Sequence, residues 1–426
     1  MTEQLDLLLA EADKCFDRGE LLLARSKYRQ ALWLEPSARI NNCLGMISFR
    51  RGHLQSAIKS FMKAVDEESQ NVYFWVNLGT AYGQYEDFEK AYKCFDEALC
   101  IDEFCWEALN AGGSLYAERG HWAEAEVMFN RASLIEPYNT DLLNNMGNVN
   151  KFQGDFLEAK KKYMKALAVD PKNSNLLYNL GCLAQSNGQM EEAIELFKKC
   201  LQIDEKNTSA KHLLSALKGE DTAAAPESYV TELFDAYASS FDKALEFLGY
   251  DIPKHLHNLL GSSDLVLEQL LDLGCGTGLS GVEFKDCARV LTGVDLSSSM
   301  LQMAKKHQIY DHLHQAEIVK FLIRDEGQYD IFISSDVLSY IGDLEAVFSA
   351  AAQRAAPGAR FLFSVETTTK APNFQLQKSG RYSHSIDYVE RLAGLTGWNV
   401  ENSKTVNVRK DKEKWIEGAI YLFTLS

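Results

Sequence analysis

Residues 270–278 read LLDLGCGTG and decide the fold of the second half of this chain. The apolar run that ends at Leu273 predicts a β-strand, and Gly274, Gly276 and Gly278 predict a turn directly after it. Glycine accepts positive φ angles and has no Cβ, so such a turn lets a ligand approach the backbone closely. The stretch therefore predicts a strand and a glycine-rich turn that binds a small molecule.

A second apolar stretch, residues 289–294, ends at Asp295, seventeen residues after Gly278. An acid at the end of the second strand of a βαβ unit can accept hydrogen bonds from both ribose hydroxyls of a nucleoside ligand. The pair of motifs therefore predicts a ligand that contains a nucleoside.

The pattern of strands alternating with helices continues towards the C-terminus. Residues 328–336, 360–365 and 415–425 predict strands, and residues 300–306 and 344–355 predict helices. Such alternation implies a parallel, doubly wound sheet whose ligand lies at the carboxyl ends of the strands.

Residues 5–205 contain an internal repeat. A short motif recurs at a spacing of 33 residues once and 34 thereafter. The motif is a small residue, an aromatic residue four positions later, and a second small residue three positions after the aromatic one. One helix hairpin cannot bury its own apolar face, whereas stacked hairpins form a curved solenoid with a concave groove. The units are Ala24-Tyr28-Ala31, Ala57-Phe61-Ala64, Ala91-Phe95-Ala98, Ala125-Phe129-Ala132, Ala159-Tyr163-Ala166 and Ala193-Phe197-Cys200.

The composition narrows the possible partners and the compartment. The net charge of −16 argues against non-specific binding to nucleic acid, which needs clustered Lys and Arg. The first residues carry acids without a basic region, and no apolar run approaches the ~20 residues that span a bilayer, so we expect no signal peptide and no membrane. The nine cysteines form no CxxC pair, which predicts reduced thiols in a cytoplasmic protein and no metal site.

Three segments follow from these patterns. Residues 1–218 are expected to form the solenoid of six repeats, with 208–218 as a solvating cap helix. Residues 219–227 (GEDTAAAPE) lack apolar periodicity and predict a linker. Residues 228–426 are expected to form the α/β domain.

The repeats resemble the tetratricopeptide repeat, whose period is about 34 residues. In that family the sixth position of the first helix points into the groove, and Asn77, Asn145 and Asn179 occupy it here. An asparagine amide both donates and accepts, which suits the backbone of an extended protein or peptide partner. The alternative, that these amides solvate the groove or bond within the array, stays open.

Residues 271–278, 293–297, 329–335 and 356–358 resemble successive motifs of class I S-adenosylmethionine-dependent methyltransferases. The whole chain resembles bacterial-type predicted methyltransferases with N-terminal tetratricopeptide repeats, whose catalytic domain has a late S-G-R-Y-x-H-S segment, present here at 379–385. The resemblance implies an all-α solenoid followed by a Rossmann-like methyltransferase domain with S-adenosylmethionine as cofactor.

The resemblance also implies roles for single residues. Asp272 orders the glycine turn and approaches the methionine amino group, Asp295 binds the ribose, and Glu317 meets the adenine amine. Tyr237 belongs to a segment, residues 234–242, that is similar to the FDxxAxxYD segment which folds over the cofactor in such enzymes. The implied cofactor-binding residues are Tyr237, Asp272, Gly274, Cys275, Gly276, Gly278, Asp295, Leu296, Met300, Glu317 and Ser335.

Methyl transfer is an in-line displacement at a sulfonium carbon, so the protein mainly positions a nucleophile ~3 Å from the methyl group and excludes water. A base is needed only when the acceptor starts protonated. The candidate catalytic residues are Asp336, Arg381, Tyr382 and His384. His384 suits a base near neutral pH, Arg381 suits an acceptor carboxylate, and a structural role for His384 stays open.

Three readings of the function remain. The first is a methyltransferase whose repeats recruit a protein or peptide acceptor. The second is a methyltransferase of a small molecule, with repeats used for assembly. The third is a non-catalytic adaptor with a vestigial nucleotide fold. Residues 335–338 (SDVL) lack the Asp/Asn-Pro-Pro-Tyr/Phe sequence of enzymes that methylate DNA amino groups.

Overall fold

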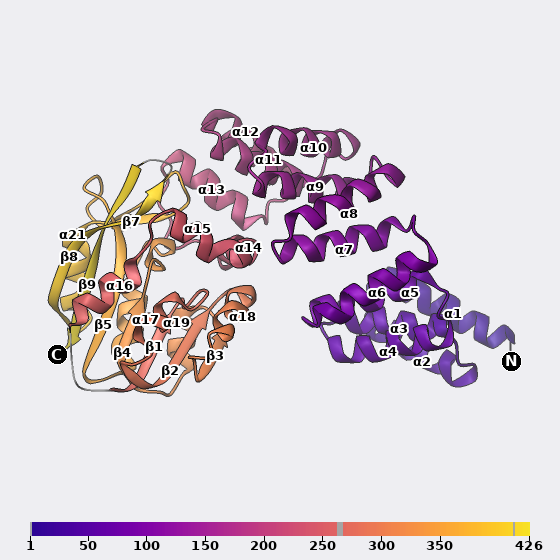
Figure 1. Ribbon diagram of the computed structural model, residues 1–426, viewed down its shortest axis with the longest axis horizontal. Coiled ribbons are helices and arrows are strands. Elements are labelled where there is room, and N and C mark those ends of the chain that lie inside the picture. Colours follow the sequence, from indigo (N-terminus) through magenta and orange to yellow (C-terminus); the bar gives the residue numbers. More distant parts are fainter. Residues whose placement is uncertain (1, 262–266, 412–413) are drawn as a thin grey trace. The chain divides into compact units, whose positions relative to one another are not determined.

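The computed structural model describes residues 2–261, 267–411 and 414–426. The chain divides into two compact units, one that ends at Leu176 and one that comprises Leu177–Ser426. The described part of the first unit is helical, and the second unit contains a nine-stranded mixed sheet (Figure 1). Both predicted fold classes, a helical repeat solenoid and an α/β domain, are confirmed.

The first unit consists of antiparallel helix pairs, and from α3 onward a glycine of one helix lies against an aromatic ring of its partner helix. A Cβ added to Gly45 would lie 2.6 Å from the Phe61 ring, and one added to Gly147 would lie 2.5 Å from the Tyr163 ring. Only glycine permits this approach of the ring to the backbone at these two positions. The helices are α1 (Thr2–Asp17), α2 (Leu21–Leu34), α3 (Ala38–Arg50), α4 (Leu54–Glu67), α5 (Val72–Gln84), α6 (Phe88–Ile101), α7 (Trp106–Glu118), α8 (Trp122–Ile135), α9 (Thr140–Phe152) and α10 (Phe156–Val169).

Two of the predicted groove asparagines bond to other asparagines of the array. Asn77 Nδ2 donates to Asn42 Oδ1 at 2.9 Å, and Asn145 Nδ2 donates to Asn110 Oδ1 at 3.1 Å. The amides therefore connect neighbouring repeats, as the alternative reading of these residues expects.

The repeats continue into the second unit through α11 (Ser174–Ser186), α12 (Met190–Ile203) and α13 (Thr208–Lys218). The unit boundary thus falls within α11, ahead of the linker predicted at 219–227, because α13 packs against α14 (Glu227–Tyr237) of the α/β part. The domain limits drawn from the sequence stay a prediction. The expectation that 208–218 is a solvating cap is wrong, since these residues of α13 are buried: Ser209, Ala210, His212, Leu213, Leu214, Ala216 and Leu217.

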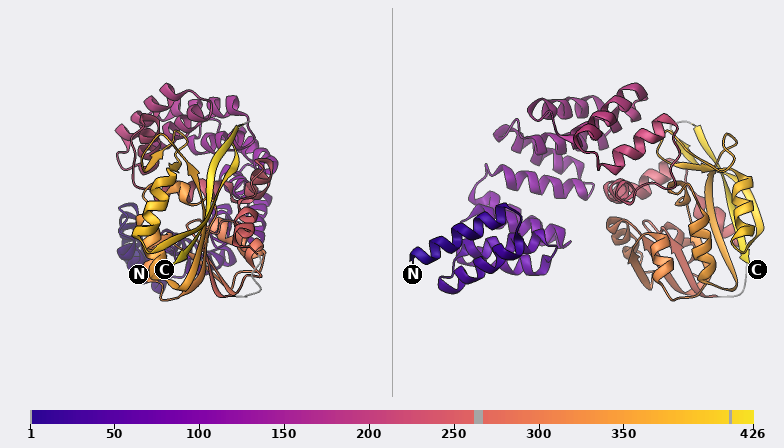
Figure 2. Two further views of the ribbon diagram at one scale, coloured as in Figure 1. Left: turned by 90° about the vertical axis from the view of Figure 1, so that its left-hand side faces the viewer. Right: turned by 180° about the vertical axis from the view of Figure 1, so that it is seen from behind.

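The sheet has the strand order β3-β2-β1-β4-β5-β7-β6, and β9 pairs with β5 and with β8. Strands β1 to β5 run parallel, and β9 is antiparallel to both of its neighbours. Figure 2 shows the same strands from two further directions. The strands are β1 (Leu267–Leu273), β2 (Ala288–Asp295), β3 (His312–Gln315), β4 (Tyr329–Ser334), β5 (Ala355–Thr367), β6 (Phe374–Leu376), β7 (Tyr382–His384), β8 (Trp398–Asp411) and β9 (Lys414–Leu425).

The chain order reverses between β1 and β4, and ligands of doubly wound sheets bind at the carboxyl ends of strands on either side of such a point. Buried side chains alternate along β4, with Ile331 and Ile333 in one core cluster and Phe332 in the other. The remaining helices are α15 (Phe241–Phe247), α16 (Ile252–Leu260), α17 (Leu279–Phe284), α18 (Ser298–Lys306), α19 (Ile318–Arg324), α20 (Glu345–Gln353), α21 (Ile386–Leu395), and the 3-10 turns η1 (Ala238–Ser240) and η2 (Leu338–Tyr340).

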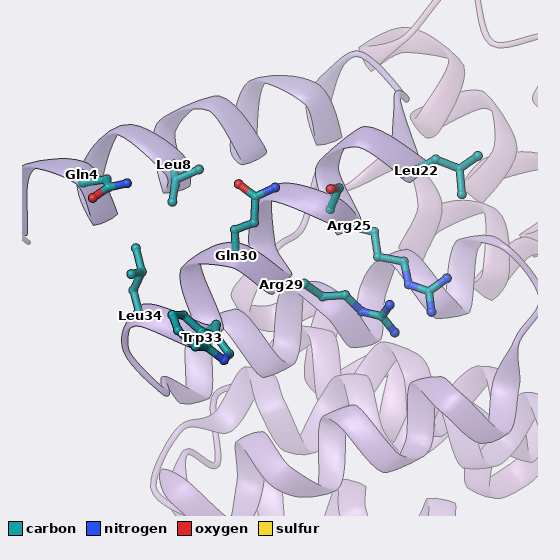
Figure 3. A pocket seen from close by; sticks show the side chains of 9 residues that line it. Gln4, Leu8, Leu22, Arg25, Arg29, Gln30, Trp33 and Leu34 are labelled. Atoms are coloured by element: carbon teal, nitrogen blue, oxygen red, sulfur yellow. The ribbon is translucent and has the colours of Figure 1, made fainter.

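A surface hollow of about 710 Å³ lies over α1 and α2 (Figure 3). Arg25 and Arg29 extend from α2 beside it, and the indole of Trp33, at 87% exposure, forms part of its lining. Within the described ranges, no helix has the length and apolarity needed to cross a bilayer.

Candidate functional site

A cavity of about 480 Å³ lies at the carboxyl ends of β1, β2 and β4. This volume is within the range of about 300–1,000 Å³ that small-molecule sites occupy. The lining includes these predicted residues: Tyr237, Gly274, Cys275, Gly276, Asp295, Leu296, Met300, Glu317, Ser335, Asp336 and Arg381.

The glycine turn that follows β1 forms part of the cavity wall. Gly274, Gly276 and Gly278 have φ angles of +76°, +53° and +99°, which a side chain would strain. A Cβ on Gly274 would lie 2.4 Å from Val337, whereas one on Gly276 would meet no atom within 4 Å. The backbone at Gly276 therefore faces open space, as close approach of a ligand requires.

Asp295 lies at the end of β2, beside this turn. Its Oδ2 accepts a hydrogen bond from Gly276 N at 2.9 Å, and its Oδ1 accepts one from Ser297 N at 2.8 Å. Burial raises the pKa of the Asp295 carboxyl to about 6, although the two amides counteract this effect. Each carboxylate oxygen retains further acceptor capacity, which suits two hydroxyl donors on one ligand.

Asp272, in contrast, lies beneath the turn. Its carboxylate is fully buried, its Oδ2 accepts from Tyr310 Oη at 2.7 Å, and its Oδ1 has no partner. Burial raises the pKa of the Asp272 carboxyl to about 7, opposed by the Tyr310 bond. Neither Asp272 nor Gly278 is among the described residues that line the cavity, and their predicted roles toward the cofactor stay predictions.

The segment at residues 234–242 covers the cavity, and both of its aspartates bond to the loops that form the site. Asp235 Oδ1 accepts from Ser297 Oγ at 2.5 Å, and Asp242 Oδ1 accepts from Thr277 Oγ1 at 2.5 Å. Phe234, Tyr237 and Phe241 line the cavity from α14 and α15. The segment is therefore fixed to the loop after β1 and to the loop after β2.

Two polar residues complete this side of the cavity. Glu317 precedes α19, and its carboxylate accepts from Val319 N at 3.0 Å and from Lys320 N at 2.8 Å. Ser335 follows β4, and its Oγ accepts from Ser280 Oγ at 2.8 Å. Both side chains line the cavity with existing partners that fix their orientation.

The wall after β4 contains a square of four charged side chains. Arg381 pairs with Asp336 at 2.6 Å and with Glu366 at 2.7 Å, and Arg409 pairs with the same acids at 2.9 and 2.7 Å. These side chains are at most 15% exposed. Arg381 Nη1 also donates to Tyr340 Oη at 2.8 Å. Burial alone lowers the pKa of Arg381, but Asp336, Tyr340 and Glu366 outweigh it and raise the pKa well above its ordinary value.

Asp336 holds its place in the square through an uncommon backbone conformation. Its φ angle is +58°, and its amide donates to Ser364 Oγ at 2.8 Å. The two predicted residues Asp336 and Arg381 thus meet in the cavity wall, but as partners of each other. Each carboxylate and guanidinium of the square has at least two charged partners.

Tyr382 and His384 do not reach the cavity. Both are fully buried, and Tyr382 Oη bonds to Thr222 Oγ1. His384 Nε2 donates to the carbonyls of Ile341 and Gly342 at 2.9 and 3.1 Å, and burial lowers its pKa to about 4. The geometry contradicts the prediction that these two side chains act at the methyl group, because a catalytic base must reach the proton that it removes.

Sequence reasoning missed Arg409 and Glu366. Glu366 is a single acid at the end of an apolar strand, β5, and it is buried. Because acids are rarely buried without a paired charge, an acid in such a strand is a signal that a cation lies next to it. Arg409 lies in the charged stretch of β8, VRKD, which resembles an exposed strand end, so only its pairing with β9 reveals its burial.

Comparison with known proteins agrees with this geometry. A methyltransferase domain model matches residues 271–361, and tetratricopeptide repeat models match residues 72–105 and 138–206. A malonyl-[acyl-carrier protein] O-methyltransferase of Serratia marcescens is 33% identical over 32% of this chain and 51% of its own length. A ubiquinone biosynthesis O-methyltransferase of Escherichia coli is 25% identical over 32% of this chain and 62% of its length.

The chain spans between two fifths and two thirds of the length of these curated relatives. Among solved structures, magnesium protoporphyrin IX methyltransferase from Synechocystis PCC 6803 is 17% identical, with 48% of this chain and 100% of that chain covered and a TM-score of 0.36. PilF of Pseudomonas aeruginosa is 16% identical, with 50% and 98% covered and a TM-score of 0.44. The matched models show that the chain contains tetratricopeptide repeats and, after them, a methyltransferase domain.

Proposed function

We propose that the cavity binds S-adenosylmethionine and that the protein transfers its methyl group to an acceptor. One observation carries the proposal: the Asp295 carboxylate and the open backbone at Gly276 lie together at the carboxyl edge of the sheet. Bound S-adenosylmethionine supplies a methyl group that is already activated on a sulfonium sulfur. The residues of the chain orient the cofactor and exclude water.

The cavity residues fit the parts of this cofactor. Asp295 would accept from the ribose hydroxyls, and Leu296 and Met300 would contact the adenine. Glu317 would face the adenine amine, and Tyr237 would close the methionine end from the covering segment. Aromatic and aliphatic side chains such as Phe234, Phe241 and Leu245 line the cavity, which also suits a desolvated displacement.

The acceptor, on this proposal, needs no base from the protein. Asp336 is already bonded to two guanidinium groups, and burial raises the pKa values of Tyr237, Tyr250 and Tyr340. A nucleophile that is ionised near neutral pH, such as a carboxylate oxygen, reacts without proton removal. The names of the two curated relatives, both O-methyltransferases and one acting on malonyl-[acyl-carrier protein], support an oxygen acceptor.

The repeats would bring a protein or peptide to the enzyme through the groove residues Asn77, Asn145 and Asn179. The bond of Asn77 to Asn42 uses one of its two amide donors, and Asn145, which donates to Asn110 and to Ser114, offers a partner its amide oxygen. A methyltransferase of a free small molecule, with repeats used for assembly, is the alternative that the small-molecule names of the relatives favour.

The cofactor site is tested by titration calorimetry of S-adenosylmethionine into the full chain and into Asp295→Asn. The substitution removes the negative charge of a group that would accept hydrogen bonds from two ribose hydroxyls. We expect the binding free energy to fall by about 2–3 kcal/mol, so the affinity should weaken at least about 30-fold. Asp286→Ala, at an exposed acid elsewhere in the same domain, is the matched control. Undiminished binding to Asp295→Asn would overturn the site, and this result would also favour the non-catalytic adaptor.

The acceptor is tested by radiolabel transfer from S-adenosylmethionine into a cell extract that is then separated into protein and small molecules. A carboxyl methyl ester releases volatile methanol in mild alkali, whereas N-methyl and ether O-methyl groups do not. Alkali-stable label would contradict the carboxylate while leaving the methyltransferase intact. Label in protein that falls in the Asn77→Ala, Asn145→Ala double variant, but not in the exposed control Asn130→Ala, would support recruitment by the groove.

A further inference from the structure

Helix α13 bonds to the methyltransferase domain at several points, although the sequence assigns it to the repeats. Thr208 Oγ1 lies 2.9 Å from Ser228 Oγ, and Ser209 Oγ donates to Glu232 at 3.3 Å. Both partners belong to α14, whose other side lines the cavity. The helix therefore packs directly on the segment that covers the proposed cofactor site.

The deepest of these contacts is made by His212, which is 3% exposed. Its Nε2 lies 2.9 Å from the carbonyl oxygen of Gly380 and donates to it, because a carbonyl only accepts. The ring is tilted against Tyr229, with centroids 4.9 Å apart, and its centroid lies 6.1 Å from that of Tyr382. Burial lowers the pKa of the imidazole, and Nδ1 has no partner, so His212 is a neutral donor here.

Gly380 can be nothing other than glycine in this contact. Its φ angle is +84°, and an added Cβ would lie 2.8 Å from Tyr229 Oη and 3.0 Å from Leu213 Cδ2. The turn around it is closed by the Gly380 amide, which donates to Gln377 O, and by the Gln377 amide, which donates to Arg381 O. Side chains from α13 and α14 thus pack against this turn.

The next residue along the chain is Arg381, whose guanidinium forms half of the charged square in the cavity wall. Only one peptide unit separates the carbonyl that His212 binds from the residue that contacts Asp336, Glu366 and Tyr340. A shift of the Gly380 carbonyl therefore displaces the start of the Arg381 side chain.

We propose that His212 is a positioning residue for the methyltransferase: it fixes Gly380 and so places Arg381 in the cavity wall. Helix α13 then contributes to methyl transfer as well as to the repeats. The proposal rests on the proposed function for its effect on transfer. Its structural part, the placement of residues 377–381 by His212, is measurable without any acceptor.

The test uses three variants of the full chain. His212→Phe keeps a ring against Tyr229 but removes the donor, and His212→Gln keeps a donor and serves as the rescue. Lys211→Ala, at an exposed residue of the same helix, is the control. Hydrogen exchange is followed by mass spectrometry in peptides that cover residues 377–385 and, for comparison, residues 270–278.

In His212→Phe, exchange in 377–385 should be at least about fivefold faster, with 270–278 unchanged, because the turn loses its bond to α13. His212→Gln should restore most of the protection. Affinity for S-adenosylmethionine should stay within about twofold, whereas label transfer into the extract should fall most at low extract concentration. Unchanged exchange in 377–385, or an equal increase in both peptides, would overturn the proposal. If the wild-type chain transfers no label at all, the proposed function fails, and the exchange result still decides the role of His212.

Discussion

Replacing Arg409 by methionine should destabilise the second unit strongly, because it leaves a buried charge without compensation. The four ion pairs of the square are 2.6 to 2.9 Å long and balance two guanidinium groups against two carboxylates. Without Arg409, Asp336 and Glu366 share Arg381 alone, at 14% and 6% exposure.

Removal of one partner from a buried ion pair costs about 3–5 kcal/mol. For a unit of this size, that loss lowers the unfolding midpoint by about 10 °C. Differential scanning calorimetry of the full chain measures this midpoint. The transition of the second unit is identified as the one whose midpoint rises when S-adenosylmethionine is added. Arg360→Met on the same sheet is the control, since its pair with Glu401 is 3.9 Å long and one third to one half exposed, and it should cost less than about 1 kcal/mol.

The double variant Arg409→Met, Glu366→Gln separates charge from packing. It leaves one neutral pair, Arg381 with Asp336, and retains an amide oxygen as acceptor for Arg381 Nε. We expect the double variant to recover at least about 2 kcal/mol relative to Arg409→Met. A double variant that is no more stable than the single one would refute the reasoning, as would an Arg409→Met protein within about 1 kcal/mol of the wild type.

Three further predictions follow from burial and space. At pH 5 only about a tenth of an Asp295 carboxyl with a pKa of about 6 is ionised, so S-adenosylmethionine should bind about tenfold more weakly than at pH 7.5; calorimetry of Asp295→Asn should show this dependence lost. His384→Gln retains a donor for the backbone carbonyls, so the pH profile of label transfer should not change; loss of the decline in transfer at acidic pH would restore His384 as the base. Gly147→Ala should cost about 1–3 kcal/mol in denaturant titrations because its Cβ meets Tyr163 at 2.5 Å, whereas Gly394→Ala, with nothing within 4 Å, should not destabilise the protein.

The sequence by itself determined both fold classes and predicted most of the residues that form one wall of the cavity. The repeat spacing predicts the stacked hairpins because the small and aromatic residues of each unit lie on one helix, where they form the packing face of a single hairpin. The glycine turn and Asp295 are likewise local, since each lies directly after the strand that positions it. Of the eleven predicted cofactor residues, only Asp272 and Gly278 lie outside the cavity lining.

The tertiary structure alone decided the other wall of the cavity. β8 is mostly polar and exposed, so its sequence predicts no strand, and it forms one only by pairing with β9. That pairing places Arg409 opposite Glu366 and beside Asp336, residues 43 and 73 positions away in the chain. Likewise, His212 reaches Gly380 across 168 positions. Periodicity and motifs predict contacts between residues that are close in the sequence. The strand order of the sheet determines which buried charges pair, and the packing of α13 determines the contact of His212 with Gly380.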